Sequence, residues 1–353
     1  MPDSQTAALP PEAVNAVNVL RRFLLRQWAL LLSMPLLLWP ALYNGFPLVF
    51  SDTGTYISQL IERHLGWDRP PFYSLFLLLL GWGKSLWPPV MVQAIFTAWL
   101  ITRVRRTIIP QMGAAYDFGI IGILAIATAL PWATGEIMPD LFTPLMVLGL
   151  FLLAFDPNLQ KAENALLILT LAGMMTFHLT NLPIYFGLCL TVLALARWIG
   201  MMMPWRLIMA APVLSILALG AVNLIGTGIP SISPYGATFY LARLLADGPA
   251  RETLAQDCPH EDWALCHYQK EIPDSADAFL WMNSSPLYRA GGPKRLIVQT
   301  KKIIRLTLAE HPASAFDGPV ARCVEILGGV ISGFIQPRES ALARRWRLHH
   351  GEA

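Results

Sequence analysis

Acidic residues beside long apolar runs are the first candidates for chemistry in this chain. Asp52 lies in the polar stretch 50–56, just after the first apolar run. A charge near hydrocarbon is unfavourable unless it is solvated or paired, so this carboxylate needs a reason to be there. As a functional group it is a general base or a metal-associated carboxylate, fixed at the membrane–water boundary by the first helix. As a structural group, it or a neighbouring hydroxyl caps the helix expected near Tyr56.

A second pair of acids, Glu136 and Asp140, lies four residues apart between two apolar runs. The pair could bind a divalent cation or orient a hydroxyl substrate. The alternative is a solvated turn in which Asp140 lies near the N-terminus of the next helix, where the helix dipole favours an acid. His178, close to Asn181 at the end of another apolar run, is either a substrate contact or an ordinary interfacial residue.

Basic and aromatic residues near the first acid are candidates for substrate binding. Arg69 precedes two prolines, and Lys84 ends the short apolar run that follows them. A guanidinium matches the geometry of a phosphate, so these two residues are candidates for binding a lipid-linked phosphate, with ordinary lipid headgroups as the alternative. Arg243 is either a second phosphate contact or a surface residue. Tyr56, in the same polar stretch as the first acid, is a further candidate substrate contact.

Two cysteines in a polar C-terminal segment indicate a local cross-link. Cys258 and Cys266 are eight residues apart, a spacing that suits a disulfide if the segment faces an oxidising compartment. A zinc site that also uses His260 and His267 is an alternative, although the spacing matches no standard zinc finger. Free thiols are the third alternative.

The composition is that of an integral membrane protein. Hydrophobic residues make up 55% of the 353 residues and charged residues only 14%, whereas ordinary globular proteins carry about 25% charged residues. The twelve tryptophans fit aromatic belts at the membrane interfaces. The net charge of +3 gives no indication of nucleic-acid binding.

The positions of the arginines predict the membrane topology. Three arginines within 21–26 precede the first apolar run, Trp28–Tyr43, which places the N-terminus in the cytoplasm. The next run, Pro71–Trp82, has only about twelve residues, which is short for a span and typical of a re-entrant helix. We therefore expect residues 44–87 to form one external loop, also containing an amphipathic helix over Tyr56–Leu65.

The remaining apolar runs then alternate across the membrane. This arrangement keeps the arginine cluster 103–106 in the cytoplasm. It also places Asp52, Glu136, Asp140 and His178 on one external face. The expected later spans are Pro88–Thr102, Phe118–Trp132, Pro139–Phe155, Asn164–Phe177, Leu182–Ala196 and Leu207–Ile225.

The predicted fold is an all-α polytopic membrane protein with about seven or eight transmembrane helices. Residues 1–27 form a cytoplasmic segment and residues 28–225 the transmembrane domain. Residues 226–318 form a periplasmic segment with helices expected over Thr238–Ala246 and Lys294–Ala309. Residues 319–353 contain a marginal last span, Pro319–Ile335, and a basic tail.

Three short motifs in the first 225 residues resemble the GT-C superfamily of polytopic glycosyltransferases, such as the aminoarabinose transferases and protein O-mannosyltransferases. These enzymes carry an acidic motif in the first external loop, a basic stretch that opens a juxtamembrane helix, and a further acid after the third span. This chain has one acid where many relatives have two adjacent acids, and fewer spans. The matching motifs are Ser51-Asp52-Thr53-Gly54-Thr55-Tyr56, Asp68-Arg69-Pro70-Pro71-Phe72-Tyr73 and Gly135-Glu136-Ile137-Met138-Pro139-Asp140.

The resemblance implies transfer of a sugar from a polyprenyl-phosphate donor to a periplasmic or lipid-linked acceptor in the bacterial inner membrane. Asp52 is then the base or the carboxylate that orients the acceptor, Arg69 a donor phosphate contact, and Glu136 and Asp140 supporting acids. The resemblance fixes no cofactor, and a divalent cation is the one candidate.

Two other functions remain open. A non-catalytic protein of envelope assembly would bind its partner through residues 230–318. A transporter component would favour charges at mid-membrane depth, whereas nearly all charges here lie at the ends of the predicted spans.

Overall fold

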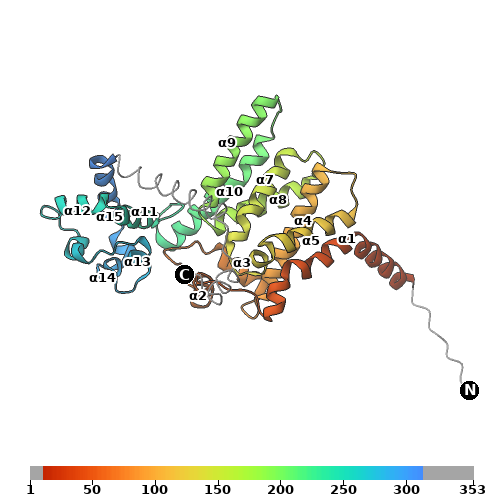
Figure 1. Cartoon of the computed structure of the whole chain (residues 1–353), viewed down its shortest axis with the longest axis horizontal. Helices are drawn as coiled ribbons and strands as arrows, with labels where there is room; N and C mark the ends of the chain where they lie inside the picture. The colour runs from red at the N-terminus through yellow and green to blue at the C-terminus, as the bar shows by residue number, and fades with distance from the viewer. Residues whose placement is uncertain (1–10, 313–353) are drawn as a thin grey trace, which may run out of the picture. The chain divides into compact units, whose positions relative to one another are not determined.

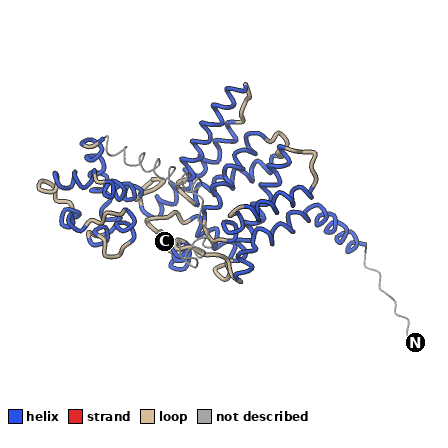
Figure 2. Tube along the Cα trace, viewed as in Figure 1, coloured by secondary structure: helices blue, strands red, loops and turns tan. Residues whose placement is uncertain are grey.

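The computed structural model describes residues 11–312, and every regular element longer than a single bridge within that range is a helix (Figures 1 and 2). The chain divides into two compact units between Pro234 and Tyr235, C-terminal to the expected boundary at 226. The predicted last span, Pro319–Ile335, and the basic tail lie outside the described residues.

The first unit packs ten α-helices and one 3-10 helix around an apolar core. Helix α1 contacts α4, α5 and α6, while α8 packs against α7 and α10. Leu37, Leu77, Ile121 and Leu150 are among the fully buried core side chains. The elements are α1 (Pro11–Asn44), α2 (Thr53–Glu62), α3 (Phe72–Gly81), α4 (Trp87–Ile108), α5 (Ala114–Ala127), α6 (Leu130–Gly135), η1 (Pro139–Leu141), α7 (Phe142–Phe155), α8 (Lys161–Phe177), α9 (Asn181–Ile199) and α10 (Trp205–Thr227).

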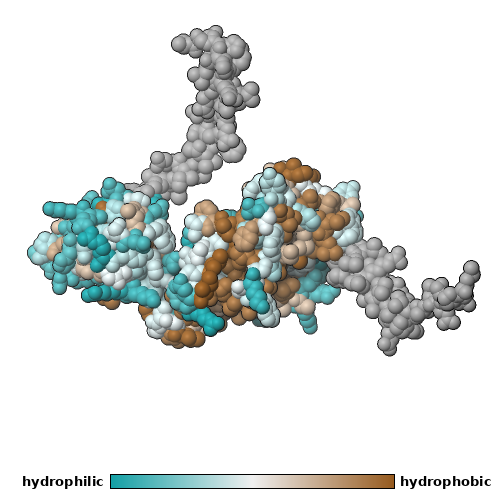
Figure 3. Space-filling model, turned by 90° about the horizontal axis from the view of Figure 1, so that it is seen from below, coloured by the Kyte–Doolittle hydropathy of each residue, from teal (hydrophilic) through white to brown (hydrophobic). Residues whose placement is uncertain are grey.

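Two helices of this unit, α9 and α10, are long and apolar enough to span a membrane by length and composition. Four further apolar segments are shorter: Trp28–Asn44, Phe72–Gly81, Ala114–Ala127 and Pro139–Phe155. The ten residues of α3 rise only about 15 Å, half the thickness of a bilayer core, which is too short to span it. A re-entrant position for α3 stays a prediction. Hydrophobic side chains cover much of the surface of the unit, shown in brown in Figure 3.

One predicted helix is wrong. The sequence pattern favours a single span over Phe118–Trp132, but α5 ends at Ala127 and a separate short helix, α6, begins at Leu130. Pro131 has no N–H with which to continue the helical ladder. The hydroxyl oxygen of Thr128 instead accepts a hydrogen bond from the Leu130 N–H, at 3.1 Å, and this bond starts the new helix.

Buried ion pairs join the end of α4 to α5 and to the turn after α7. Arg105 Nε donates to the Asp117 carboxylate at 2.6 Å, and both side chains are almost fully buried. Arg103 contacts Asp156 at 3.0 Å and Glu163 at 3.2 Å. The arginine cluster and the Asp156–Glu163 turn therefore lie at the same end of the unit, as the predicted alternation of spans requires.

The second unit has a core and a cross-link of its own. Leu245, Phe279 and Leu296 are fully buried within it. Cys258 and Cys266 form a disulfide with their Cα atoms 5.5 Å apart, so neither thiol is free to bind zinc. The elements are α11 (Gly236–Asp247), α12 (Pro249–Asp257), η2 (Ala264–Glu271), α13 (Ala276–Trp281), α14 (Pro286–Arg289) and α15 (Gly292–Glu310).

We expect Asp117→Asn to destabilise the first unit strongly. The substitution leaves the Arg105 guanidinium buried without a counter-charge, and breaking a buried pair in this way costs about 3–5 kcal/mol. Thermal unfolding in detergent should show a clearly lower Tm. The control is Glu62→Gln, which removes an exposed pair with His64 worth at most about 1 kcal/mol. Equal Tm changes in the two variants would contradict a structural role for the Asp117 pair.

Candidate functional site

Backbone hydrogen bonds hold the first loop against the turn that carries the second pair of acids. Leu48 N–H donates to the carbonyl of Gly135 at 2.9 Å, and Ile137 N–H donates to the carbonyl of Leu48 at 2.8 Å. The Thr53 hydroxyl donates to the carbonyl of Ile137 at 2.9 Å. These bonds fix the start of α2 beside residues 135–140.

A buried amide, Gln93 of α4, supports the same turn from beneath. Its Nε2 donates to the carbonyls of Thr134 at 3.1 Å and Glu136 at 3.0 Å. Its Oε1 accepts a hydrogen bond from the Tyr73 hydroxyl at 3.0 Å, which joins α3 to the cluster. Our sequence reasoning missed Gln93. The only signal was one amide side chain inside the apolar run Pro88–Thr102.

Asp52 forms an ion pair with Arg69. The Arg69 guanidinium also lies 5.6 Å from the centre of the buried Tyr56 ring. The Arg69 backbone carbonyl accepts a hydrogen bond from Gln59 at 3.1 Å, which holds the loop against α2. Asp52 occupies the N-cap position of α2 but makes no capping hydrogen bond through its side chain. The Thr53 hydroxyl accepts, at 2.9 Å, from the N–H of Phe50, which lies before the helix. Because no side chain caps α2 at Asp52, the capping interpretation of Asp52 is wrong.

Asp68 is a second carboxylate near Arg69 that our sequence reasoning did not select. Its Oδ2 lies 3.7 Å from Arg69 Nε, and its side chain is 10% exposed. Burial raises the pKa of Asp68, against the opposing effect of the guanidinium. Its position in the motif next to Arg69 was the signal that could have found it.

Electrostatic interactions show that the predicted acids and His178 share one region. Burial lowers the pKa of His178, and the charges of Asp140, Arg69 and Asp52 all act on its imidazole. Burial also raises the pKa of Glu136, reinforced by the nearby charge of Asp140. Four predicted residues from three separate turns, together with Arg69, therefore form one cluster, which we call the acidic site.

Two other side chains complete the local chemistry. Burial raises the pKa of Tyr56 to about 12, so its phenol stays protonated at neutral pH. His178 Nδ1 lies 2.6 Å from the Thr180 hydroxyl, which orients the imidazole. The acidic site thus offers carboxylates that accept protons, a guanidinium that binds anions, and a phenol that donates hydrogen bonds.

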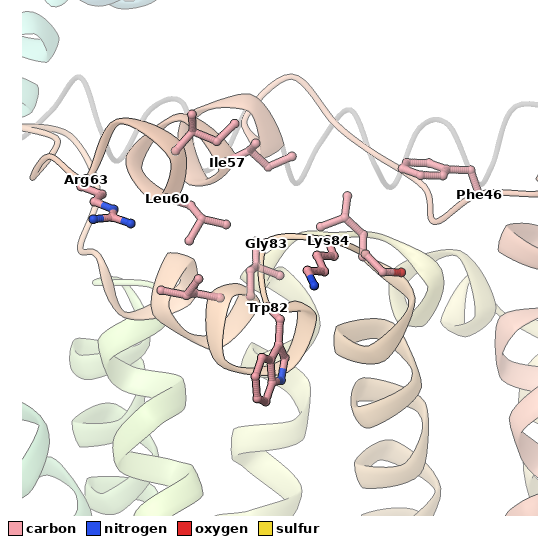
Figure 4. A pocket seen from close by; sticks show the side chains of 12 residues that line it. Phe46, Ile57, Leu60, Arg63, Trp82, Gly83 and Lys84 are labelled. Carbon is pink, nitrogen blue, oxygen red and sulfur yellow. The ribbon is translucent and has the colours of Figure 1, made fainter.

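A pocket of about 680 Å³ lies between α2 and α3, and Figure 4 shows its lining. Lys84 lines this pocket, so its place is here and not among the charges around Asp52. The pocket is mainly apolar, with the cations of Arg63 and Lys84 among its walls. Its remaining lining residues are Phe46, Ile57, Leu60, Ile61, Leu77, Leu78, Trp82, Gly83, Ser85 and Leu86.

Two further predictions concern Arg243 and a divalent cation. Arg243 belongs to the second unit, where its Nε lies 3.1 Å from Asp247, and its contact with a phosphate stays a prediction. Within residues 11–312, no three or more His, Cys, Asp or Glu side chains form a group that could hold a metal ion. A divalent cation stays a prediction.

Comparison with known protein families, curated proteins and solved structures finds no match to this chain. The resemblance to GT-C glycosyltransferases therefore rests on the three motifs alone and stays a prediction.

We expect Gln93→Leu to destabilise the first unit by about 2–3 kcal/mol. The change leaves two buried carbonyls and one phenol without their partner, at roughly 1 kcal/mol for each bond. Tyr73→Phe, the matched control, removes only the bond between the phenol and the amide. Thermal unfolding of the single and double variants should show non-additive effects. Strict additivity would mean that Gln93 and Tyr73 do not act together.

We expect Glu136→Gln to stabilise the protein at pH 8 and to have little effect below about pH 4. In the wild type, the contribution of protonated Glu136 to stability is fully present below the pKa of an unfolded glutamate, about 4.3. It is lost as the pH rises through the raised pKa of folded Glu136, because the charge is then half-buried near Asp140. Thermal unfolding of both proteins at the two pH values provides the measurement. An equal difference in Tm between the variant and the wild type at both pH values would indicate a steric effect instead of an effect of the charge.

Proposed function

We propose that this protein is a glycosyltransferase of the bacterial inner membrane, with seven or eight spans and a cytoplasmic N-terminus. It transfers a sugar from a polyprenyl-phosphate donor to a periplasmic or lipid-linked acceptor. The observation that carries the proposal is the Asp52–Arg69 ion pair in the acidic site. The site is next to α2 and α3, which form a mainly apolar pocket suited to a lipid chain.

The distribution of charge supports a membrane orientation for this site. The arginine cluster and the Asp156–Glu163 turn lie at one end of α7, and the acidic site lies at the other. The 14 residues of α7 separate them by about 20 Å, and the helix surfaces between are apolar. An excess of arginine on one side is typical of the cytoplasmic face. The acidic site then faces the periplasm.

The pocket between α2 and α3 has the chemistry needed for a polyprenyl phosphate. Its aliphatic walls suit an isoprenoid chain, and Arg63 and Lys84 supply cations for a phosphate. Both helices also contact the acidic site or its support, since Tyr56 on α2 packs against Arg69 and Tyr73 on α3 donates a hydrogen bond to Gln93. A single lipid-linked donor would therefore contact two faces of the same pair of helices.

Exchange of ion-pair partners supplies a mechanism. Arg69 Nε is buried and, among the described residues, donates no hydrogen bond, so this donor is available to a phosphate oxygen. A phosphate that binds Arg69 competes with Asp52 and frees its carboxylate. Asp52 then takes the proton of an acceptor hydroxyl as the hydroxyl oxygen attacks the anomeric carbon. The bond between that carbon and the phosphate oxygen breaks, and polyprenyl phosphate leaves with the bonding electrons.

The other members of the acidic site have supporting roles in this proposal. Glu136 and Asp140 orient the acceptor hydroxyl, and His178 lies within the field of the same charges. The Tyr56 phenol, protonated at neutral pH, packs below the Arg69 guanidinium and limits its movement.

A non-catalytic protein of envelope assembly is the second candidate. The second unit favours it, because that unit has its own core and a disulfide and could present a stable surface to a partner. This alternative requires residues 230–318 for function and leaves Asp52 dispensable.

We expect Asp52→Asn to abolish sugar transfer, because the amide cannot take the proton of the acceptor. Envelope glycans from cells that carry only the variant, analysed by mass spectrometry, should match those of a deletion strain. Arg69→Lys should retain a small part of the activity, since the ammonium keeps the charge but loses the fork geometry. Glu62→Gln, on the same helix pair and exposed, is the matched control with unchanged glycans.

Membrane insertion has to be checked in the same strains. A single cysteine is introduced at position 136 or at position 104, each in the otherwise wild-type chain and in the Asp52→Asn chain. A membrane-impermeant thiol reagent added to intact cells should label the cysteine at 136 and not the cysteine at 104. Normal glycans from a correctly inserted Asp52→Asn protein would overturn the proposal and favour the assembly role.

A further inference from the structure

One helix of the second unit, α15, carries a continuous basic face. Its five cations are Lys294, Arg295, Lys301, Lys302 and Arg305. At 100° per residue, these cations and Val298 fall within about a third of the helix circumference. The opposite face is buried and includes Leu296, Ile303 and Thr307. We call the exposed side the basic face; its members are Lys294, Arg295, Val298, Lys301, Lys302 and Arg305.

Most cations of the basic face form no ion pair with any other residue in the range 11–312. Elsewhere in the second unit, Arg243, Arg251 and Arg289 each form an ion pair with a carboxylate. On the basic face only Lys302 does so, with Glu261 at 2.6 Å. Within the described residues, the other four cations form no ion pair. A stripe of like charge without counter-charges repels itself, so it does not contribute to the stability of the unit.

The position of these cations along the helix is also unfavourable for folding. Lys294 and Arg295 lie in the first turn of α15, where no acid is present and where the helix dipole is positive. Helices are stabilised by acids at this end. The placement of two cations here therefore suggests a ligand with negative charge.

An exposed apolar residue in the middle of the basic face narrows the choice of ligand. Val298 is 78% exposed, with Lys294, Lys301 and Arg305 around it on the same face. Cations that surround an apolar side chain suit a membrane interface, where headgroups take the cations and the side chain enters the acyl boundary. A purely ionic partner such as an acidic peptide gains nothing from the valine.

A short link joins the second unit to α10. Helix α10 is long and apolar enough to span, and it ends beside the loop after α2, since a Cβ on Gly226 would lie 1.7 Å from Leu65 Cδ1. Only residues 228–235 separate the end of α10 from the start of α11. So short a link raises the local concentration of any membrane-binding surface in the second unit.

We infer that the basic face of α15 docks on the anionic lipid headgroups of the membrane that holds α10. Lys294, Arg295, Lys301 and Arg305 bind the headgroup phosphates, and Val298 inserts between them. This inference needs only the membrane location of the chain and does not depend on sugar transfer.

The test places a probe at the centre of the basic face in the full-length protein. Val298→Cys is labelled with bimane in a Cys189→Ser, Cys323→Ser background, with the Cys258–Cys266 disulfide intact. The protein is reconstituted in nanodiscs of phosphatidylcholine alone or with 30% phosphatidylglycerol, both containing a lipid-attached nitroxide quencher. We expect strong quenching only in the anionic nanodiscs. Raising the salt from 0.1 to 1 M, which shortens the Debye length from about 10 to about 3 Å, should reduce it.

Neutralising variants separate docking by charge from simple proximity. Lys294→Gln, Arg295→Gln, Lys301→Gln and Arg305→Gln should each reduce the ratio of docked to free α15 roughly fivefold. Lys270→Gln removes an exposed cation of the same unit outside α15 and is the matched control, with no effect expected. Thermal unfolding confirms that each variant is folded.

Three outcomes would overturn the inference. They are equal quenching in neutral and anionic nanodiscs, equal effects of Lys301→Gln and Lys270→Gln, and a probe that responds to soluble polyglutamate but not to anionic lipid. The last result would identify an acidic protein as the partner. No sugar donor is present, so the result does not depend on whether the proposed transfer occurs.

Discussion

The first unit depends on how it satisfies polar groups inside an apolar interior. The turn before Asp140 has buried and partly buried backbone carbonyls, and leaving such a group without a hydrogen bond lowers the stability of the fold. The Gln93 amide pairs two of these carbonyls and a phenol from α3. Leu48 pairs a third carbonyl and an N–H of the same turn. These few bonds join the first loop, α3, α4 and the turn. Together with the bond from the Thr53 hydroxyl to the Ile137 carbonyl, they hold the start of α2 against the turn that carries Glu136, although the two segments are far apart in sequence.

Ion pairs at the two ends of the unit serve different purposes. Asp117 and Arg105 are buried, at short distance, and Arg105 also donates to two carbonyls, so its capacity is used within the fold. The Asp52–Arg69 pair is less enclosed, and Arg69 keeps one buried donor without a hydrogen bond. A saturated buried pair holds helices together, whereas a pair with spare capacity at a water-accessible end can exchange its partner for an anion.

Both proposals rest on contact between cations and lipid phosphates, but at different depths. Arg63 and Lys84 stand at an apolar pocket that suits a lipid chain. The cations of α15 instead line an exposed face of a unit whose core is complete without them. As proposed, the first arrangement would select a particular lipid by enclosing it, while the second would recognise a surface by its charge density.

Much of this organisation follows from the sequence because apolar runs, prolines and arginines act locally. The runs predicted most helices of the first unit to within a few residues, and the motif around Asp52 and Arg69 indicated the first loop. The break between α5 and α6 was missed because the hydropathy of residues 118–132 stays high through the point, next to Pro131, at which the helix is interrupted. Only the tertiary structure could show that Asp52 contacts Arg69, that Lys84 lies in a separate pocket, and that Gln93 supports the acidic site. These are contacts between residues distant in sequence, and their geometry is set by packing and by the need to pair buried polar groups, which no local pattern encodes.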